Sequence, residues 1–237
     1  WLAGLIDADG GFFVSRGHFV SCEITLHEKE AQTLYFLKKH LGGSVKPRLK
    51  KQAVRWRLHK RDPLLTLLQN LNGLFQTERL TLQFQKALDV YGIQPLPRKQ
   101  ISLTNAWLSG FFCGDGSFSI NKRAGYQPSV SISQKEKPVL TEIALLFGGE
   151  VYYDTSWDGW IWWIDARTHV EILNYFQRFR LHNSLKEARL KSIRRLVGYL
   201  DRQVHLDPKS KKRLEHFVHV FQANEIKKKP TSLRESP

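Results

Sequence analysis

Apolar residues recur first at helical spacing and then in alternation, and the chain contains this order twice. In residues 1–14, Leu2, Leu5 and Ile6 form one helical stripe, and after Gly10 the chain continues with residues that suit a strand. Residues 107–120 have the same order. Because a 3.6-residue period is typical of helices and a two-residue period of strands, each segment predicts a short helix that leads directly into a strand.

The two segments open a longer repeat. Asp9 and Asp115 stand 106 positions apart, and Trp56 and Trp162 share this offset. Within each copy, alternating apolar and polar residues predict two hairpins, and a helix is expected after each hairpin. The sequence therefore predicts an α+β fold of two pseudo-symmetric αββαββα repeats, each with one antiparallel sheet.

Composition marks the boundaries of the two copies. We expect an N-terminal repeat over residues 1–91, a proline-containing linker over residues 92–106 and a C-terminal repeat over residues 107–200. Residues 201–237 are expected to form one further helix and a basic tail. The sequence contains no methionine, so we also expect the reading frame to extend before Trp1.

Several helix ends are predicted from capping residues. Asp62, which precedes Pro63, and Thr168 are expected to be the N-caps of one helix in each copy. Gly10 and Gly116 are expected to end the two repeated helices. These glycines leave a carboxylate at the last position of each helix.

Small residues and a terminal acid distinguish the two repeated helices. Gly4 and Gly110 lie in mid-helix, where glycine costs roughly 1 kcal/mol relative to alanine, and close approach of the other helix would explain that cost. A helix C-terminus carries partial negative charge, which disfavours Asp9 and Asp115 unless a cation binds there. If the helices pack side by side, both carboxylates converge as oxygen ligands for a hard divalent cation such as Mg²⁺.

Charge and cysteine content narrow the class of protein. The net charge is +15, from 37 Lys and Arg against 22 Asp and Glu, so a polyanion such as nucleic acid is the expected partner. Composition alone does not separate an enzyme from a basic RNA-bound ribosomal protein. Cys22 and Cys113 fall at apolar-facing positions, which argues against a disulfide framework or a thiolate metal site. No apolar run approaches the roughly 20 residues of a membrane span, so no membrane partner is expected.

The second predicted hairpin of the first copy, residues 45–60, forms a basic plate. Its inward positions are apolar, which leaves Arg55 and Arg57 on the opposite face. A solvated face is the alternative reading of such a strand. In the second copy, Ile161 and Trp163 occupy the outward strand positions that Arg55 and Arg57 have in the first copy. The outward faces of the two sheets therefore differ, and a long asymmetric partner is expected.

At the repeated helices the sequence resembles a known family. Leu2–Gly10 reads LAGLIDADG, the motif that names the LAGLIDADG homing endonucleases, and Leu108–Gly116 resembles the second, degenerate copy in single-chain members of that family. The similarity extends from Trp1 to about Leu200. It implies a saddle of two antiparallel sheets over double-stranded DNA, joined at the paired motif helices.

The resemblance implies a monomeric, intron-encoded DNA endonuclease that cuts both strands across the minor groove, leaves short 3′ overhangs and serves the mobility of its host intron. Mg²⁺ is the implied cofactor, Mn²⁺ is expected to substitute, and Ca²⁺ is expected to bind without supporting cleavage. The family also suggests a mitochondrial location. Two alternatives are an intron maturase that binds RNA and a DNA-binding protein that does not cleave; retention of both Asp9 and Asp115 argues against either as the sole function.

Outward residues of the strands are expected to contact DNA. A two-stranded ribbon fits the major groove, where arginine pairs with guanine and asparagine or glutamine with adenine. The expected contacts in the first copy are Ser15, Arg16, His18, Ser21, Glu23, Lys46, Arg48, Lys50, Arg55, Arg57 and His59. Those in the second copy are Ser119, Asn121, Arg123, Gln127, Ser129, Ser131, Trp163, Asp165 and Arg167. Cationic contacts would position the duplex, and the varied polar side chains would read it.

The resemblance also assigns catalytic roles. Asp9 and Asp115 would each bind a divalent cation near one scissile phosphate, and the further candidate ligands are the carbonyls of Ala8 and Gly114. The second copy departs from the family motif, because Cys113 stands where the first copy has Asp7. That acid is generally a structural capping group in the family, so catalysis is expected to survive its replacement.

The family places a polar residue at the end of the second strand and a basic residue near the start of the last helix, where they order solvent around the phosphate. Gln134 and Lys186 match these places in the second copy. The first copy offers Leu26 and Arg79. Since Leu26 cannot hold a water molecule, the two DNA strands are expected to be nicked at unequal rates.

Overall fold

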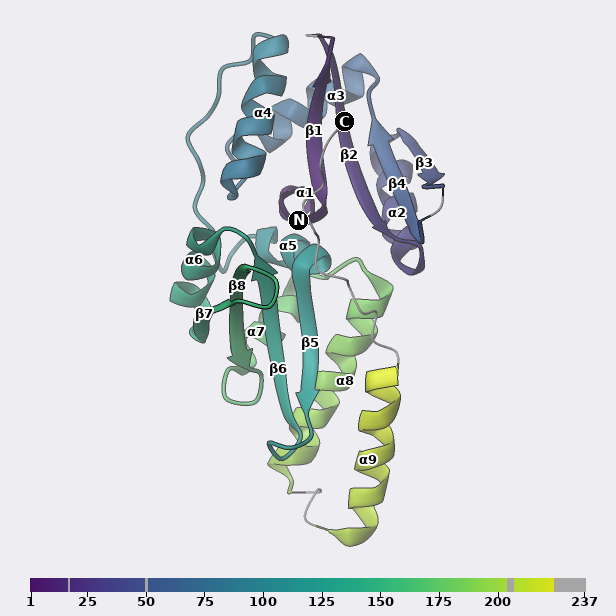
Figure 1. Cartoon of the computed structure of the whole chain (residues 1–237), viewed down its shortest axis with the longest axis vertical. Helices are drawn as coiled ribbons and strands as arrows, with labels where there is room; N and C mark the ends of the chain where they lie inside the picture. The colour runs from purple at the N-terminus through teal and green to yellow at the C-terminus, as the bar shows by residue number, and fades with distance from the viewer. Residues whose placement is uncertain (17, 50, 204–206, 224–237) are drawn as a thin grey trace.

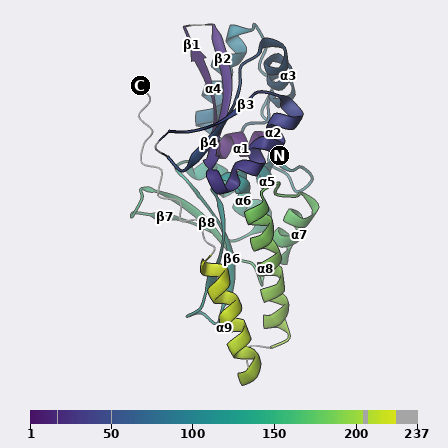
Figure 2. The same ribbon diagram turned by 90° about the vertical axis from the view of Figure 1, so that its right-hand side faces the viewer.

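The protein consists of two pseudo-symmetric halves joined end to end through one pair of helices (Figure 1). The computed structural model describes residues 1–16, 18–49, 51–203 and 207–223. Each half contains one four-stranded antiparallel sheet, and α2, α3, α7 and α8 lie to one side of the two sheets (Figure 2). The predicted α+β architecture of two sheets joined at the motif helices is confirmed.

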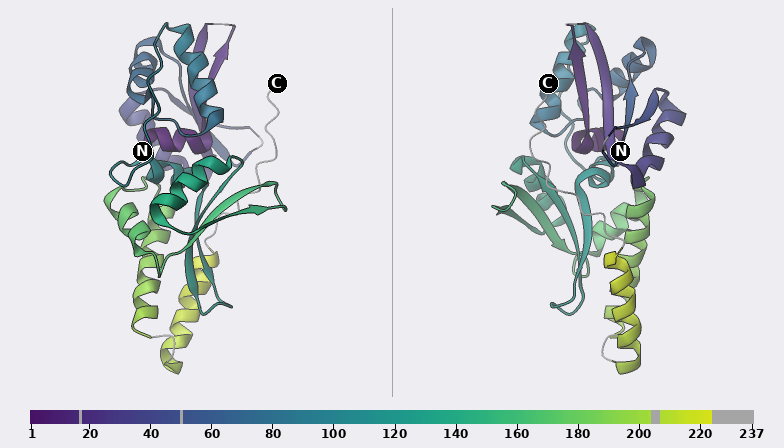
Figure 3. Two further views of the ribbon diagram at one scale, coloured as in Figure 1. Left: turned by 90° about the vertical axis from the view of Figure 1, so that its left-hand side faces the viewer. Right: turned by 45° about the vertical axis from the view of Figure 1, so that its right-hand side comes forward.

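The elements follow the predicted order in both halves. The first half contains α1 (Leu2–Asp9), β1 (Gly10–Ser15), β2 (Phe19–His27), the 3₁₀ helix η1 (Glu28–Glu30), α2 (Ala31–Leu41), β3 (Ser44–Pro47), β4 (Ala53–Leu58), α3 (Arg61–Leu71) and α4 (Glu78–Val90). The second half contains α5 (Trp107–Asp115), β5 (Gly116–Asn121), β6 (Gln127–Gln134), α6 (Lys137–Phe147), β7 (Glu150–Asp154), β8 (Gly159–Asp165), α7 (Val170–Arg178) and α8 (Ser184–Asp201). A further helix, α9 (Pro208–Ala223), lies beside α8 (Figure 3).

The two sheets have the same topology, β1-β2-β4-β3 and β5-β6-β8-β7. In the first sheet Gly10 pairs with Ile24, and in the second Gly116 pairs with Ile132. Residues of β2 therefore correspond to residues of β6 that lie 108 positions later, because the turn before β6 is longer. This register decides which residues of the two halves are structural equivalents.

One tryptophan per half anchors the sheet to the helix layer. Trp56 on β4 and Trp162 on β8 are fully buried. Their indole N–H groups donate to the carbonyls of Gly42 and Gly148, each at 2.9 Å, where α2 and α6 end. Since a buried indole N–H needs a partner, these bonds fix how each helix lies on its sheet.

The backbones of α1 and α5 touch at the centre of the molecule. A Cβ atom on Gly4 would overlap the carbonyl oxygen of Trp107 and lie 2.6 Å from Phe111 N. A Cβ atom on Gly110 would overlap the carbonyl oxygen of Trp1 and lie 2.9 Å from Leu5 N. The prediction that mid-helix glycines permit close approach of the repeated helices is confirmed.

Both predicted N-caps are wrong by one or two positions. Helix α3 begins at Arg61 with Lys60 as N-cap, so Asp62 lies inside the first turn, where its charge still suits the helix dipole. The N-cap of α7 is His169, and the hydroxyl of Thr168 is hydrogen-bonded to the His169 ring at 2.8 Å.

Gly10 and Gly116 end their helices, but in extended rather than left-handed conformation, with φ of −108° and −79°. The strands β1 and β5 begin at these same residues, which requires extended backbone. Glycine is needed for space, since a Cβ atom on Gly10 would lie 2.7 Å from the Cα of Ile6.

The last described helix packs on the second half. Leu214, Val218 and Phe221 of α9 are buried, and the Arg189 guanidinium of α8 lies 3.9 Å from the centre of the Phe221 ring. The residues expected to form a basic tail, 224–237, lie outside the described residues. Among the helices of the described ranges, none has the length and apolar character that crossing a membrane demands.

Candidate active site and nucleic-acid interface

The two terminal acids of the motif helices converge. Asp9 is the last residue of α1 and Asp115 the last residue of α5, and both are half-buried. A Cβ atom on Gly114 would lie 3.0 Å from Asp9 Oδ2, so the Asp9 carboxylate lies against the residue that precedes Asp115. The close crossing at Gly4 and Gly110 thus brings two carboxylates and two negative helix ends to one place.

Two polar side chains surround the Asp115 end. Gln134, at the end of β6, donates from Nε2 to Asp115 Oδ2 at 2.5 Å. The Lys186 ammonium donates to the carbonyls of Phe112 at 2.7 Å and Gly114 at 3.1 Å. Lys186 is only 9% exposed, and its positive charge offsets the negative end of α5.

At the Asp9 end the cation is an arginine, and an apolar residue stands at the position of Gln134. Arg79, in the first turn of α4, donates from Nη2 to Asp7 O at 2.8 Å and from Nη1 to Gly10 O at 3.1 Å. By the strand register, Leu26 is the structural equivalent of Gln134, and it is buried. The two ends are therefore alike in charge and different in the residue beside the acid.

The donor set fits a hard divalent cation. Two carboxylates and the carbonyl oxygens of the helix ends, Ala8 and Gly114 among them, offer oxygen ligands only, as Mg²⁺, Mn²⁺ and Ca²⁺ require. Within the part of the chain that the structure describes, no group of three or more His, Cys, Asp or Glu side chains gathers as a metal site. The side-chain candidates are Asp9 and Asp115 because their carboxylates lie at the adjoining helix ends.

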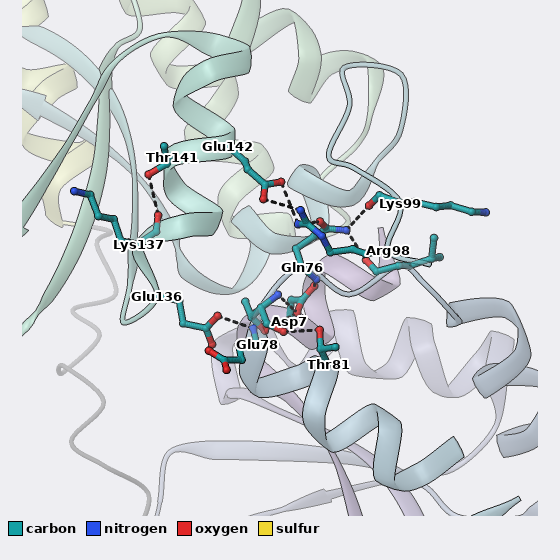
Figure 4. A network of polar contacts seen from close by, with 12 residues as sticks. Asp7, Gln76, Glu78, Thr81, Arg98, Lys99, Glu136, Lys137, Thr141 and Glu142 are labelled. Atoms are coloured by element: carbon teal, nitrogen blue, oxygen red, sulfur yellow. Dashed lines mark hydrogen bonds and ion pairs between the residues drawn. The ribbon is translucent and has the colours of Figure 1, made fainter. Parts of the chain in front are cut away.

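The other acid of the first motif is a buried structural group. Asp7 accepts from the backbone N–H of Gln76 at 2.9 Å (Figure 4). It also accepts from Thr77 Oγ1 at 2.7 Å, Thr77 N at 3.2 Å and Trp107 Nε1 at 2.9 Å. Burial raises the pKa of Asp7 to about 6, against the lowering effect of these hydrogen bonds. Asp7 thereby ties α1 to the start of α4 and to α5.

Cys113 fills the corresponding place in the second motif with a different contact. Its thiol donates to the Leu181 carbonyl, just before α8. Burial raises the pKa of Cys113 to about 12, so the thiol stays protonated at neutral pH. Cys22 is also buried and free.

The basic plate of the first half is organised around one carboxylate. Glu23 on β2 forms ion pairs with Arg55 Nη1 at 2.8 Å and Arg57 Nε at 3.1 Å. Ion pairs near the surface contribute only about 0–1 kcal/mol, so both arginines can exchange Glu23 for another acceptor at small cost. The open face of this sheet is therefore cationic, and its two guanidinium groups can donate hydrogen bonds to a new acceptor.

The other predicted DNA contacts of the first half differ in exposure. Ser21, which pairs with Phe13 across the hairpin, is buried. Lys50 lies outside the described residues. The remaining positions are exposed or half-buried: Ser15, Arg16, His18, Lys46, Arg48 and His59. Phe13 and Phe19, which are 48% and 57% exposed on this hairpin, were not predicted as contacts, although the outward phase of Phe13 is visible in the strand alternation.

The open face of the second half is less basic. Ser131 and Glu150 stand opposite Trp163. Gln127 donates to Asp165 at 2.8 Å, and Ser129, also predicted to contact DNA, is buried and bonded to Ser119 at 2.7 Å.

Two further predicted contacts of the second half have partners within the protein. Asn121 is exposed, and its side chain accepts from the backbone N–H of Arg123 at 3.1 Å. Arg167 forms a surface ion pair with Asp201 of α8 at 2.9 Å, so its predicted DNA contact requires that it exchange this partner. Arg167 lies two residues after Asp165, the last residue of β8.

Comparison with known proteins agrees with the fold and the motifs. A family model described as LAGLIDADG endonuclease matches residues 108–197. The "Probable intron-encoded endonuclease aI2" of Debaryomyces hansenii is 28% identical over 200 residues, which cover 78% of this chain and 30% of the relative. The "Intron-encoded RNA maturase bI4" of Saccharomyces cerevisiae is 32% identical over 183 residues, 76% of this chain and 28% of the relative. The chain thus spans less than a third of the length of these two proteins.

Solved structures share the whole fold. The structure described as "I-SmaMI bound to uncleaved DNA target in the presence of Calcium ions" superposes with a TM-score of 0.70 at 17% identity. The superposition covers 92% of this chain and 96% of I-SmaMI.

Proposed function

We propose that this chain, which belongs to the LAGLIDADG endonuclease family, is a site-specific endonuclease that hydrolyses phosphodiester bonds in both strands of DNA. The observation that carries the proposal is the convergence of Asp9 and Asp115 at the adjoining ends of α1 and α5. Two acids at the junction of two pseudo-symmetric sheets can serve two phosphates of one duplex. Cleavage across the minor groove would leave short 3′ overhangs.

Asp9 and Asp115 would hold divalent cations, with the carbonyls of Ala8 and Gly114 as further ligands. Mg²⁺ suits these hard donors, and Mn²⁺ is expected to substitute. A bound ion of this kind supplies an activated water and relieves the negative charge on the leaving oxygen. Ca²⁺ is expected to bind without supporting cleavage, and the related I-SmaMI was solved on uncleaved DNA with calcium ions.

The remaining side chains orient the acids and supply charge. The hydrogen bond from Gln134 holds the Asp115 carboxylate in one orientation. Lys186 and Arg79 place positive charge at the ends of α5 and α1, where a scissile phosphate would add negative charge. Preorganised charge of this kind stabilises the pentacoordinate transition state without reorganisation during the reaction.

The difference between the two open sheet faces favours an asymmetric target. Arg55 and Arg57 can donate to guanine in the major groove. The second face presents Trp163, Ser131 and Asp165 instead, so the two half-sites must differ in sequence. A single chain with two unlike halves fits such a site as a monomer.

We extend the proposal to the biology of the gene. The chain would promote mobility of a host intron, as suggested by the intron-encoded relative from Debaryomyces hansenii, and we propose a mitochondrial location. Residues 1–91 and 107–200 would act as the two DNA-binding repeats, with residues 92–106 as their linker and residues 201–237 as a C-terminal extension.

The second candidate function is RNA binding as an intron maturase, alone or beside cleavage. It is motivated by the 32% identity to a yeast protein named as an RNA maturase. Retention of both carboxylates favours cleavage, because a protein that only binds RNA has no need for two acids at unfavourable helix ends.

The test is incubation of the protein with its intron-insertion sequence in Mg²⁺ and separately in Ca²⁺. We expect double-strand cleavage in Mg²⁺ and binding alone in Ca²⁺. Asp9→Asn and Asp115→Asn should abolish cleavage and keep DNA affinity within about threefold, since each removes one charge from the site and none from the sheets. Binding of intron RNA with no cleavage of DNA in Mg²⁺ would establish the maturase instead.

A further inference from the structure

A carboxylate of the second half closes the start of a helix in the first half. Glu136, between β6 and α6, accepts from the backbone N–H of Glu78 at 2.6 Å, in the first turn of α4 (Figure 4). It also accepts from the backbone N–H of Arg79 at 3.1 Å. The next N–H, of Leu80, is satisfied by the Thr77 hydroxyl. The first N–H groups of a helix have no partner within it and carry partial positive charge, so an anion there is stabilising.

The same turn of α4 carries the cation of the first active-site end. Arg79 extends from it to the carbonyls of Asp7 and Gly10, which flank Asp9. The guanidinium position therefore depends on where the first turn of α4 lies. Asp7 holds the residues just before that turn, and Glu136 holds the turn itself.

The second half contains the mirror arrangement. Glu30 stands 106 positions before Glu136, is 5% exposed, and accepts from Asn183 Nδ2 at 2.7 Å. Asn183 is the N-cap of α8 and accepts from the Lys186 backbone N–H at 3.1 Å. The Lys186 ammonium then reaches the end of α5 beside Asp115.

We propose, on the premise of the proposed nuclease function, that Glu136 and Glu30 are positioning residues that make each active-site end depend on the opposite half. Glu136 sets the first turn of α4 directly and so places Arg79. Glu30 acts through Asn183 and so places Lys186. Each half thus supplies one carboxylate that positions the active-site cation of the other half.

The experiment measures the nicking rates of the two DNA strands separately, with each strand end-labelled. Arg79→Ala identifies the DNA strand whose nicking rate depends on the Asp9 end of the site. Glu136→Ala should slow that same strand relative to the other by roughly tenfold, as loss of a helix cap that positions a charge predicts. Glu30→Ala should slow the other strand, and so change the ratio of the two nicking rates in the opposite direction.

Glu142→Ala is the matched control. Glu142 lies on α6 and forms an ion pair of 2.9 Å with Arg98 of the linker between the halves, but it caps no helix (Figure 4). It should leave the strand ratio unchanged. Thermal unfolding and Ca²⁺-dependent DNA binding of every variant separate a local change from loss of the fold.

The outcomes distinguish this inference from its premise. The positioning role of Glu136 is supported if Glu136→Ala shifts the ratio of the two nicking rates in the same direction as Arg79→Ala does. Equal slowing of both strands, or an unchanged ratio, in a folded Glu136→Ala protein overturns it and leaves the nuclease function standing. Absence of cleavage by the unmodified chain would overturn the nuclease function, and the inference with it.

Discussion

The side-chain amide of Gln134 donates to Asp115 across 2.5 Å, whereas the same position of the other sheet holds Leu26. One active-site end therefore orients its acid with a polar group, and the other packs an apolar side chain. Both helix ends carry an aspartate, so within the protein we expect a difference in nicking rate between the two strands to come from such neighbours.

Gln134→Leu should make the Asp115 end of the site resemble the Asp9 end, where Leu26 holds the equivalent position. We expect the strand that depends on Asp115 to be nicked roughly tenfold more slowly, because one hydrogen bond to a charged acceptor contributes about 1.5–3 kcal/mol. Measurement is by single-turnover cleavage with each strand labelled. Equal initial rates in the unmodified protein, or no change in the variant, would contradict the role given to this amide.

Gly4→Ala should destabilise the whole protein, because the new methyl group would overlap the Trp107 carbonyl between α1 and α5. We expect a loss of about 3 kcal/mol in the free energy of unfolding, measured by chemical denaturation. Gly198→Ala is the control, since a Cβ atom on Gly198 meets no other atom within 4 Å, and it should stabilise α8 by about 0.5–1 kcal/mol. Equal effects at the two positions would refute the close helix crossing.

Asp7 should make stability depend on pH between about 4 and 6. Its pKa is raised to about 6 in the folded state by burial, from a reference value of 3.8, so folding favours the protonated form. The resulting contribution is fully present below pH 3.8 and is lost as the pH rises through about 6. The difference in unfolding free energy between the unmodified protein and Asp7→Asn should therefore shrink with rising pH, by an amount of the order of 3 kcal/mol. A difference that grows over this interval would show that the four hydrogen bonds outweigh burial.

Arg57→Ala should weaken DNA binding and its dependence on salt. Loss of one phosphate or base contact is expected to lower the slope of log K against log salt by about one. Binding is measured by fluorescence anisotropy in Ca²⁺ over a range of salt concentrations. Lys39→Ala, which removes an exposed cation from the helix layer, should leave the slope unchanged. A larger effect at Lys39 would place the DNA on the opposite face.

The sequence alone determined the repeat, the element order and the two acids at the helix ends. These features are local, because the period of the apolar residues fixes helix or strand, and a mid-helix glycine indicates close approach before the partner is seen. The two N-caps were misplaced because several residues near Asp62 and Thr168 can begin a helix, and tertiary contacts select among them.

Only the tertiary structure decided which distant side chains complete the site. A longer turn before β6 changes the offset between β2 and β6 to 108, and this register is what aligns Leu26 with Gln134. Glu136 reaches α4 only because the helix pair sets the two halves against each other, and the ion pair between Arg167 and Asp201 joins the residues after β8 to α8. Contacts of this kind join residues far apart in the chain, and their geometry depends on the packing of whole elements rather than on any local pattern.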